Sequence, residues 1–199
     1  MNNLRFKTKA LVIALAVMAG AMASQAGEQA NKTSAGAYVP QRGDDTFCTE
    51  VHATPDDEGC PISDIIITHY TDALGRTDTL MSSALPLDTT MWRGMGDILE
   101  RDLNFDGVAD LEICLGPMNA QGNFVYDGFL WDRNGHKFVR IENYSDIFNP
   151  EPVENVNGVR QGISGWFELD GEEETTTHEW RDGKLVPVFK KTETADNEF

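Results

Sequence analysis

The stretch FVYDGFLWDRNGHKFVRI, residues 124–141, decides the fold class of this chain. Two runs rich in aromatic and branched residues, 124–131 and 138–141, flank the dipeptide Asn134-Gly135. Asn-Gly between such runs is a strong signal for a tight hairpin, because both residues adopt positive φ at low cost. The stretch therefore predicts two antiparallel strands joined by a hairpin turn.

Runs of the same character recur along the chain, each bounded by turn residues. Asp-Gly pairs at 170–171 and 182–183 mark two further hairpins. Every connection is too short for a helical crossover between parallel strands, and short helices are expected only near 95–99 and 145–148. We predict an all-β fold, an antiparallel β-sandwich or partly open barrel built as a meander. The other predicted strands are 65–70, 76–81, 111–115, 159–169, 175–180 and 185–189.

A second motif, DLNFDGVADL at residues 102–111, directly precedes one of these strands. Side chains with oxygen atoms recur at alternate positions, a glycine comes sixth, and another carboxylate comes ninth. A hard divalent cation needs about six to eight oxygens, and such a loop can wrap them around it. The sequence therefore predicts one bound calcium ion. Its expected ligands are the side chains of Asp102, Asn104 and Asp106, the carbonyl of Val108, and Asp110 directly or through water.

The motif departs from an EF-hand, because its twelfth position is Ile113 and not a bidentate glutamate. It also occurs once, whereas dockerin-type modules carry two such loops. A structural ion is therefore expected, one that neutralises carboxylates and fixes the start of the next strand. The alternative is a plain acidic turn without an ion, since Asp, Asn and Gly also favour turns.

The first 26 residues predict a secretory signal peptide. Three basic residues precede an apolar run, 10–23, which ends in small residues and is too short to span a bilayer comfortably. We therefore predict an exported bacterial protein, periplasmic or secreted. Residues 27–45 are expected to be a flexible segment, residues 46–191 a single β domain, and residues 192–199 a flexible tail.

The net charge and the lack of known catalytic motifs limit the classes of function that this protein can have. Removing the leader takes away three basic residues and no acidic residue, so the formal charge of −17 becomes −20. Such a chain should repel nucleic acid and anionic membranes and attract basic proteins or metal ions. The sequence contains no nucleophile elbow, zinc-protease motif or phosphate-binding glycine loop. An enzyme is therefore not expected.

The sequence contains three cysteines, Cys48, Cys60 and Cys114. In an oxidising compartment an odd number suggests one bridge and one free thiol. Cys48 and Cys60 flank a stretch with Pro, Asp and Gly that can fold back, so we predict a disulfide between them. Cys114 lies in an apolar run and is expected to pack as a small apolar residue. Sequence alone leaves its pairing with either of the others open.

The region 102–189 resembles a family of exported bacterial proteins that act as periplasmic inhibitors, or immunity proteins, against lysozyme-like effectors of type IV secretion systems. That family is related in fold to periplasmic inhibitors of invertebrate-type lysozyme. The matching features are DLNFDG at 102–107 with Asp110-Leu111, FLWD at 129–132, GHKFV at 135–139, Asn149-Pro150, and WRDGKLV at 180–186.

The resemblance implies a β-sandwich that holds one calcium ion and inserts a loop into the cleft of a basic lysozyme-like muramidase. In lysozyme-inhibitor relatives a Ser-Gly segment followed by an aromatic residue enters the active site. The corresponding residues here are Ser164, Gly165, Trp166 and Phe167, and the expected tyrosine is absent.

Three alternatives to this picture stay open. Residues 164–167 can form an ordinary strand whose aromatic side chains face opposite sides of a sheet. The whole chain can be a calcium-binding structural or interaction module of a cell-surface assembly, with no enzyme target. It can also be a hydrolase that uses the cation as a Lewis acid, which would need an open coordination position.

Overall fold

The computed structural model describes residues 45–88, 94–119 and 122–194. Strands make up almost all of its regular structure, and a single turn of 3-10 helix, η1, interrupts them. In chain order the elements are β1 (Thr46–Pro55), β2 (Pro61–Thr71), β3 (Thr77–Ser83), β4 (Ile98–Arg101), β5 (Asp110–Pro117), β6 (Phe124–Asp132), β7 (Lys137–Arg140), η1 (Tyr144–Asp146), β8 (Glu151–Val156), β9 (Val159–Leu169), β10 (Glu172–Arg181) and β11 (Lys184–Thr194).

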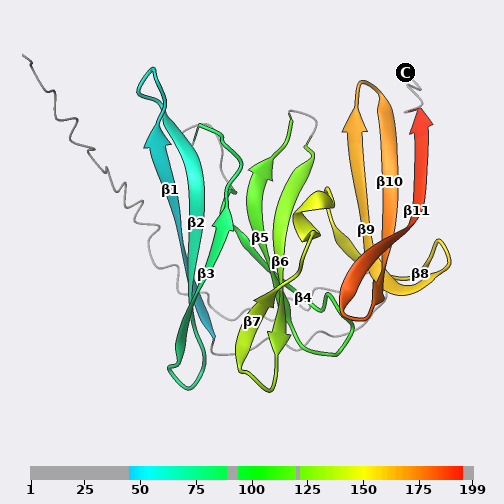
Figure 1. Cartoon of the computed structure of the whole chain (residues 1–199), viewed down its shortest axis with the longest axis horizontal. Helices are drawn as coiled ribbons and strands as arrows, with labels where there is room; N and C mark the ends of the chain where they lie inside the picture. Colours follow the sequence, from blue (N-terminus) through cyan, green and yellow to red (C-terminus); the bar gives the residue numbers. More distant parts are fainter. Residues whose placement is uncertain (1–44, 89–93, 120–121, 195–199) are drawn as a thin grey trace, which may run out of the picture.

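The strands form three antiparallel sheets (Figure 1). The N-terminal sheet has the order β1-β2-β3, the central sheet β4-β5-β6-β7, and the C-terminal sheet β11-β10-β9-β8. Each sheet is thus a meander in which neighbours in sequence are neighbours in space. The prediction of an all-β antiparallel meander is confirmed, and none of the three described sheets closes into a barrel.

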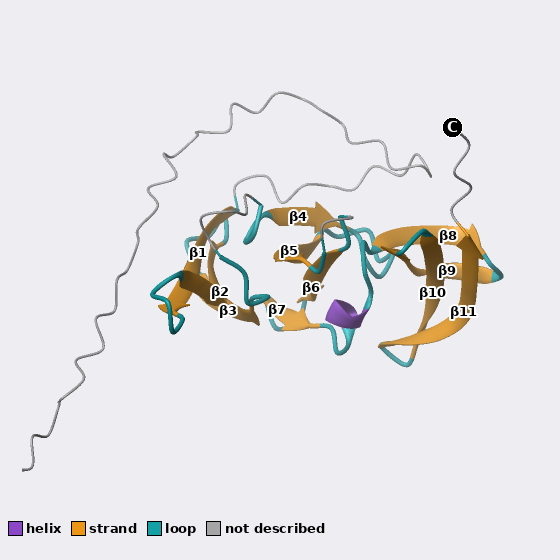
Figure 2. Cartoon of the chain, turned by 90° about the horizontal axis from the view of Figure 1, so that it is seen from above, coloured by secondary structure: helices purple, strands orange, loops and turns teal. Residues whose placement is uncertain are grey.

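The sheets are stacked along the long axis of the molecule, with the central sheet between the other two (Figure 2). One hydrophobic core joins the N-terminal and central sheets, and a second joins the central and C-terminal sheets. The buried members of the first are Ile66, Tyr70, Leu80, Leu111, Ile113, Leu115, Val125, Phe129 and Phe138. Those of the second are Leu103, Ile141, Tyr144, Ile147, Ile163 and Leu185.

Strand β5 is buried on both of its faces, because it lies in the middle layer. Leu111, Ile113 and Leu115 point into the first core. Since side chains alternate along a strand, Asp110 and Glu112 point to the opposite face. A strand in this position therefore carries carboxylates into the interior, directly behind the 102–110 loop.

Two predicted turns have the expected backbone. Leu169 pairs with Glu172 and Arg181 pairs with Lys184, so each Asp-Gly dipeptide is a two-residue hairpin loop. Both Asp170 and Asp182 have positive φ, as do the glycines that follow them. The local sequence therefore fixes these turns.

The hairpin between β6 and β7 is confirmed with a longer loop. Asp132 pairs with Lys137, so four residues lie between the strands. The positive φ falls on His136, while the Asp132 carboxylate accepts a hydrogen bond from the backbone N–H of Asn134. The aspartate side chain thus starts this turn.

Some sequence predictions need correction. Residues 95–99 do not form a helix: Gly96 has φ of 84°, and Ile98 pairs with Ile113 as the first residue of β4. The second helix is the shorter η1. Strand β11 extends to Thr194, so the predicted tail from residue 192 starts too early. The predicted leader and nearly all of the 27–45 segment lie outside the described residues, as do residues 195–199.

Among the residues that the structure describes, no helix is long and apolar enough to cross a membrane. The described residue of the N-terminal segment, Asp45, is anchored. Its carboxylate accepts hydrogen bonds from the Tyr70 hydroxyl and the Ala73 backbone N–H. Asp45 therefore ties the residue before β1 to the end of β2 and to the turn that follows it.

A candidate calcium loop at the base of the central strand

The loop between β4 and β5 folds through two residues with positive φ. Phe105 has φ of 63° and Gly107 has φ of 81°. A Cβ on Gly107 would meet nothing within 4 Å, so backbone conformation and not crowding requires the glycine there. The loop leads straight into Asp110, the first residue of the strand buried on both faces.

Hydrogen bonds turn the side-chain oxygens of this loop onto its own backbone. The two carboxylate oxygens of Asp102 accept from the N–H groups of Asp106 and Gly107, at 3.0 and 2.8 Å. The Asn104 carbonyl oxygen accepts from Asp106, and the Asp106 carboxylate accepts from Val108. The bonds of Asn104 and Asp106 reach the N–H two residues on and are Asx turns, whereas those of Asp102 span the loop.

Asp110 has a further role that the motif alone does not reveal. It is fully buried, and its two carboxylate oxygens accept hydrogen bonds from Leu103 N–H at 2.9 Å and Trp131 N–H at 2.8 Å. It therefore ties the start of the loop and the end of β6 to the first residue of β5. Direct ligation of an ion by Asp110 stays a prediction.

The carboxylates of the loop are held where negative charge is unfavourable. Burial, reinforced by the charges of Asp106 and Asp102, raises the pKa of Asp110 to about 7 against its two hydrogen bonds. Burial also raises the pKa of Asp102, and the charge of Asp106 adds to this effect. A bound divalent cation would lower the pKa of both Asp110 and Asp102, because it favours the ionised form of nearby carboxyl groups.

The available ligands are all oxygens, the donor type that calcium prefers. Among the described residues, no three Asp, Glu, His or Cys side chains converge closely enough to hold an ion by themselves. The Asn104 amide and the Val108 carbonyl would therefore have to complete a set that begins with Asp102 and Asp106. The donor chemistry of this set suits a hard cation.

Two long-range contacts that sequence reasoning missed hold the loop from outside. Arg133, in the β6–β7 turn, donates from Nη2 to the Asp106 carbonyl at 2.6 Å and lies 3.3 Å from Oδ1 of the same residue. Trp180, on β10, donates from its indole Nε1 to the Leu103 carbonyl at 2.8 Å. Neither partnership leaves a local signal in the sequence, because the partners lie far apart along the chain.

A buried ionic cluster lies behind the loop. The Glu112 carboxylate is fully buried; it accepts from the Tyr144 hydroxyl at 2.5 Å and lies 3.1 Å from Arg101 Nε. Burial raises the pKa of Glu112, and the charge of Arg101 opposes this shift. Gly128 leaves the space that Tyr144 fills, since a Cβ there would lie 2.7 Å from the ring. Through Arg101 and Tyr144, the Glu112 carboxylate joins β4, β5 and η1.

The predicted disulfide between Cys48 and Cys60 does not form. Cys48 pairs with His69 on the neighbouring strand, whereas Cys60 lies in the turn that follows Pro55. The seven strand positions from Cys48 to Pro55 put the two cysteines roughly 23 Å apart, and a bridge needs Cα atoms within about 7 Å. All three cysteines are free. Cys114 is buried as expected, and burial raises its pKa to about 11.

The segment expected to enter a muramidase cleft lies within a strand. Ser164, Gly165, Trp166 and Phe167 belong to β9 and pair with β10. A Cβ on Gly165 would lie 2.4 Å from Ile147, so this glycine permits close packing of the strand. The rings of Phe167 and Phe148 are 4.7 Å apart, whereas Trp166 is 37% exposed. The strand interpretation is therefore correct, and a projecting loop is not what these residues form.

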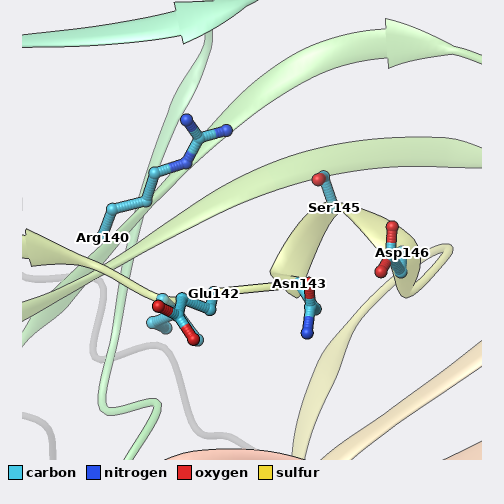
Figure 3. Close-up of a pocket in the computed structure, with 6 residues that line it drawn as sticks. Arg140, Glu142, Asn143, Ser145 and Asp146 are labelled. Carbon is cyan, nitrogen blue, oxygen red and sulfur yellow. The ribbon is translucent and has the colours of Figure 1, made fainter.

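A shallow hollow of about 390 Å³ lies at the end of β7 and beside η1 (Figure 3). The guanidinium of Arg140 and the carboxylate of Glu142 point apart in it. Arg140 is committed to the buried carboxylate of Asp127, at 2.7 Å from Nη2 and 3.0 Å from Nε. The hollow therefore shows no arrangement suited to nucleophilic or acid–base chemistry.

No protein-family model and no curated protein matches this sequence. Among solved structures, the chain is similar to one described as "Structure of a Xanthomonas Type IV Secretion System related protein". The identity is 20% and the TM-score 0.47, over 81% of this chain and 87% of that one. A similarity at this level assigns no function to the present chain.

Proposed function

We propose that this chain is an exported calcium-binding protein that acts by binding another protein, a basic lysozyme-like muramidase, and inhibiting it. The calcium ion has a structural role in this proposal, and no step of catalysis is assigned to the chain. The observation that carries the calcium part is the geometry of the loop, with its Asx turns and its crowded carboxylates.

The ion would act through the position of the loop in the fold. Asp102, Asn104, Asp106 and the Val108 carbonyl would hold it, and Asp110 would transmit the order of the loop to β5 through its bonds to Leu103 and Trp131. Because β5 is the central buried strand, ordering its first residue stiffens both adjoining cores.

The proposal that the partner is a muramidase rests on the positions of the segments that resemble the inhibitor family. The segments 129–132 and 135–139 form the β6–β7 hairpin, whose turn contacts the loop through Arg133. The segment 180–186 contacts the loop through Trp180. Residues far apart in sequence that share the resemblance are thus neighbours around one loop, which supports a common architecture with the inhibitor family.

Charge supports a basic partner. The mature chain is strongly acidic, and complementary charge accelerates association with a basic protein. Of the predicted inhibitory segment, Trp166 is exposed enough to touch such a partner, and it would do so from strand β9.

The proposal is tested with a panel of lysozyme-like muramidases. Peptidoglycan hydrolysis should fall at near-stoichiometric amounts of this protein in calcium, and less so in EDTA. Trp166→Ala should weaken inhibition, while Val188→Ala, at a residue of similar exposure (39%) on β11, should not. A panel without inhibition and without a complex on gel filtration would exclude the inhibitor role and leave the calcium role to be judged by binding measurements.

A further inference from the structure

Arg133 places a positive charge directly on the candidate calcium loop. Its Nη2 is 2.6 Å from the Asp106 carbonyl and 3.3 Å from the Asp106 carboxylate. The side chain is 56% exposed and comes from a hairpin turn. It can therefore leave this contact without disturbing either core.

The position of Arg133 matters because its partner atom belongs to the expected ligand set. Asp106 supplies the carboxylate at the fifth position of the loop, and the guanidinium takes up one of its oxygens. A calcium ion would need that carboxylate as well. Two cations cannot share it without repelling each other across a few ångströms.

Arg133 contacts the backbone carbonyl of Asp106 more closely than its carboxylate. The shorter bond, to the Asp106 carbonyl, uses an atom that is outside the expected ligand set. Arg133 can thus brace the loop through that carbonyl and still yield the carboxylate to an ion.

We propose that Arg133 is a built-in competitor of calcium, which neutralises Asp106 when no ion is bound and gives up its carboxylate when the ion enters. This inference rests on the calcium role proposed above. The loop then keeps its shape in the ion-free protein, and its calcium affinity is lower than its ligands alone would give.

The test compares calcium binding by three variants, using isothermal titration of the chelator-treated protein with calcium chloride. Arg133→Gln should lower the calcium Kd by roughly three- to tenfold, because a unit charge next to the site is removed. Arg133→Lys keeps the charge and should stay within about twofold of the unmodified protein. The control is Arg181→Gln, which changes the net charge equally at a side chain that is also 56% exposed but pairs with Glu179.

Thermal unfolding in EDTA gives a second readout. Arg133→Gln should melt below Arg181→Gln without calcium, and this difference should shrink at saturating calcium, where only the bond to the Asp106 carbonyl is lost. If the unmodified protein binds calcium and Arg133→Gln binds it equally or more weakly, the competitor role is overturned while the calcium role stands. If neither protein binds calcium, both proposals fail.

Discussion

The indole Nε1 of Trp180 donates a hydrogen bond to the backbone carbonyl of Leu103 at 2.8 Å, across 77 positions of sequence. Trp180 belongs to β10 of the C-terminal sheet, and Leu103 is the second residue of the loop that leads into β5. Leu103 is fully buried in the second core. The loop is therefore fastened to the C-terminal sheet as well as to the central sheet, so that its order and the stacking of the sheets depend on each other.

Replacing Trp180 with Phe tests this link. The variant keeps most of the apolar surface but leaves the Leu103 carbonyl without its donor, so we expect a loss of about 1 kcal/mol in the free energy of unfolding. Calcium affinity should fall as well, because the loop is less well held. Trp166→Phe, at an exposed site on β9, should change neither quantity in urea unfolding and titration experiments.

Replacing Asp110 with Asn tests the clamp at the base of the loop. Two backbone N–H groups, from Leu103 and Trp131, point at the two carboxylate oxygens. An amide offers one oxygen and one NH2 group, so one N–H would face another donor, and we expect a loss of about 1–3 kcal/mol. Asp182→Asn, at an exposed turn residue, removes the same charge and should stay within about 0.5 kcal/mol of the unmodified protein. Equal stability of the two variants in urea would contradict the clamp.

Calcium removal should lower the melting temperature. A ligand that binds only the folded state stabilises it by about 2.7 kcal/mol when its free concentration is a hundredfold above Kd. The melting temperature in calcium should therefore exceed that in EDTA, whereas Asp106→Ala should melt at the same temperature in both. A melting curve of the unmodified protein that is indifferent to EDTA would remove the structural role of the ion.

His178 predicts a dependence of stability on pH. Burial lowers the pKa of His178 below its ordinary value of 6.5, against the backbone bond to Ile163 and the charge of Asp146. The folded state therefore binds this proton less tightly than the unfolded state. The contribution of neutral His178 to the free energy of unfolding is therefore fully present above pH 6.5. It is lost as the pH falls from 6.5 towards the lower pKa of the folded state. His178→Gln should flatten the dependence of the free energy of unfolding on pH in this window, as measured by urea unfolding at a series of pH values.

Asn123 joins the central and C-terminal sheets like an added strand residue. Its fully buried amide donates to the Glu168 carbonyl at 2.6 Å and accepts from the Glu168 N–H at 2.9 Å. In Asn123→Asp a carboxylate oxygen would face that carbonyl, so we expect a loss of roughly 2 kcal/mol or more. Asn155→Asp, at an exposed residue of β8, serves as the control. Urea unfolding that does not separate the two variants would show that this junction is unimportant.

Local signals predicted the two Asp-Gly hairpins of this chain correctly, whereas strands β1 and β8 and their hairpins were not predicted. Asp170-Gly171 and Asp182-Gly183 form two-residue turns, because the positive φ they require is a property of these residues themselves. The same holds for Gly107 in the loop. The antiparallel all-β fold was predictable because the connections are too short to hold the helical crossover that parallel strands need.

The contacts that organise the site could not be predicted in this way. Arg133 and Trp180 reach the loop from other hairpins through backbone carbonyls, which carry no side-chain identity. The cysteine prediction failed for a related reason. A bridge requires the residues that flank the turn to meet, but Cys48 lies far from the turn along an extended strand. The length of each strand depends on packing across the three sheets and not on the local sequence alone.

The most direct test of the account is a crystal structure grown in calcium. We predict one ion bound to the side chains of Asp102, Asn104 and Asp106 and to the Val108 carbonyl, at about 2.3–2.6 Å, with the Arg133 guanidinium withdrawn from the Asp106 carboxylate. A loop without an ion at millimolar calcium, with its carboxylates still bound only to backbone N–H groups and to Arg133, would contradict it.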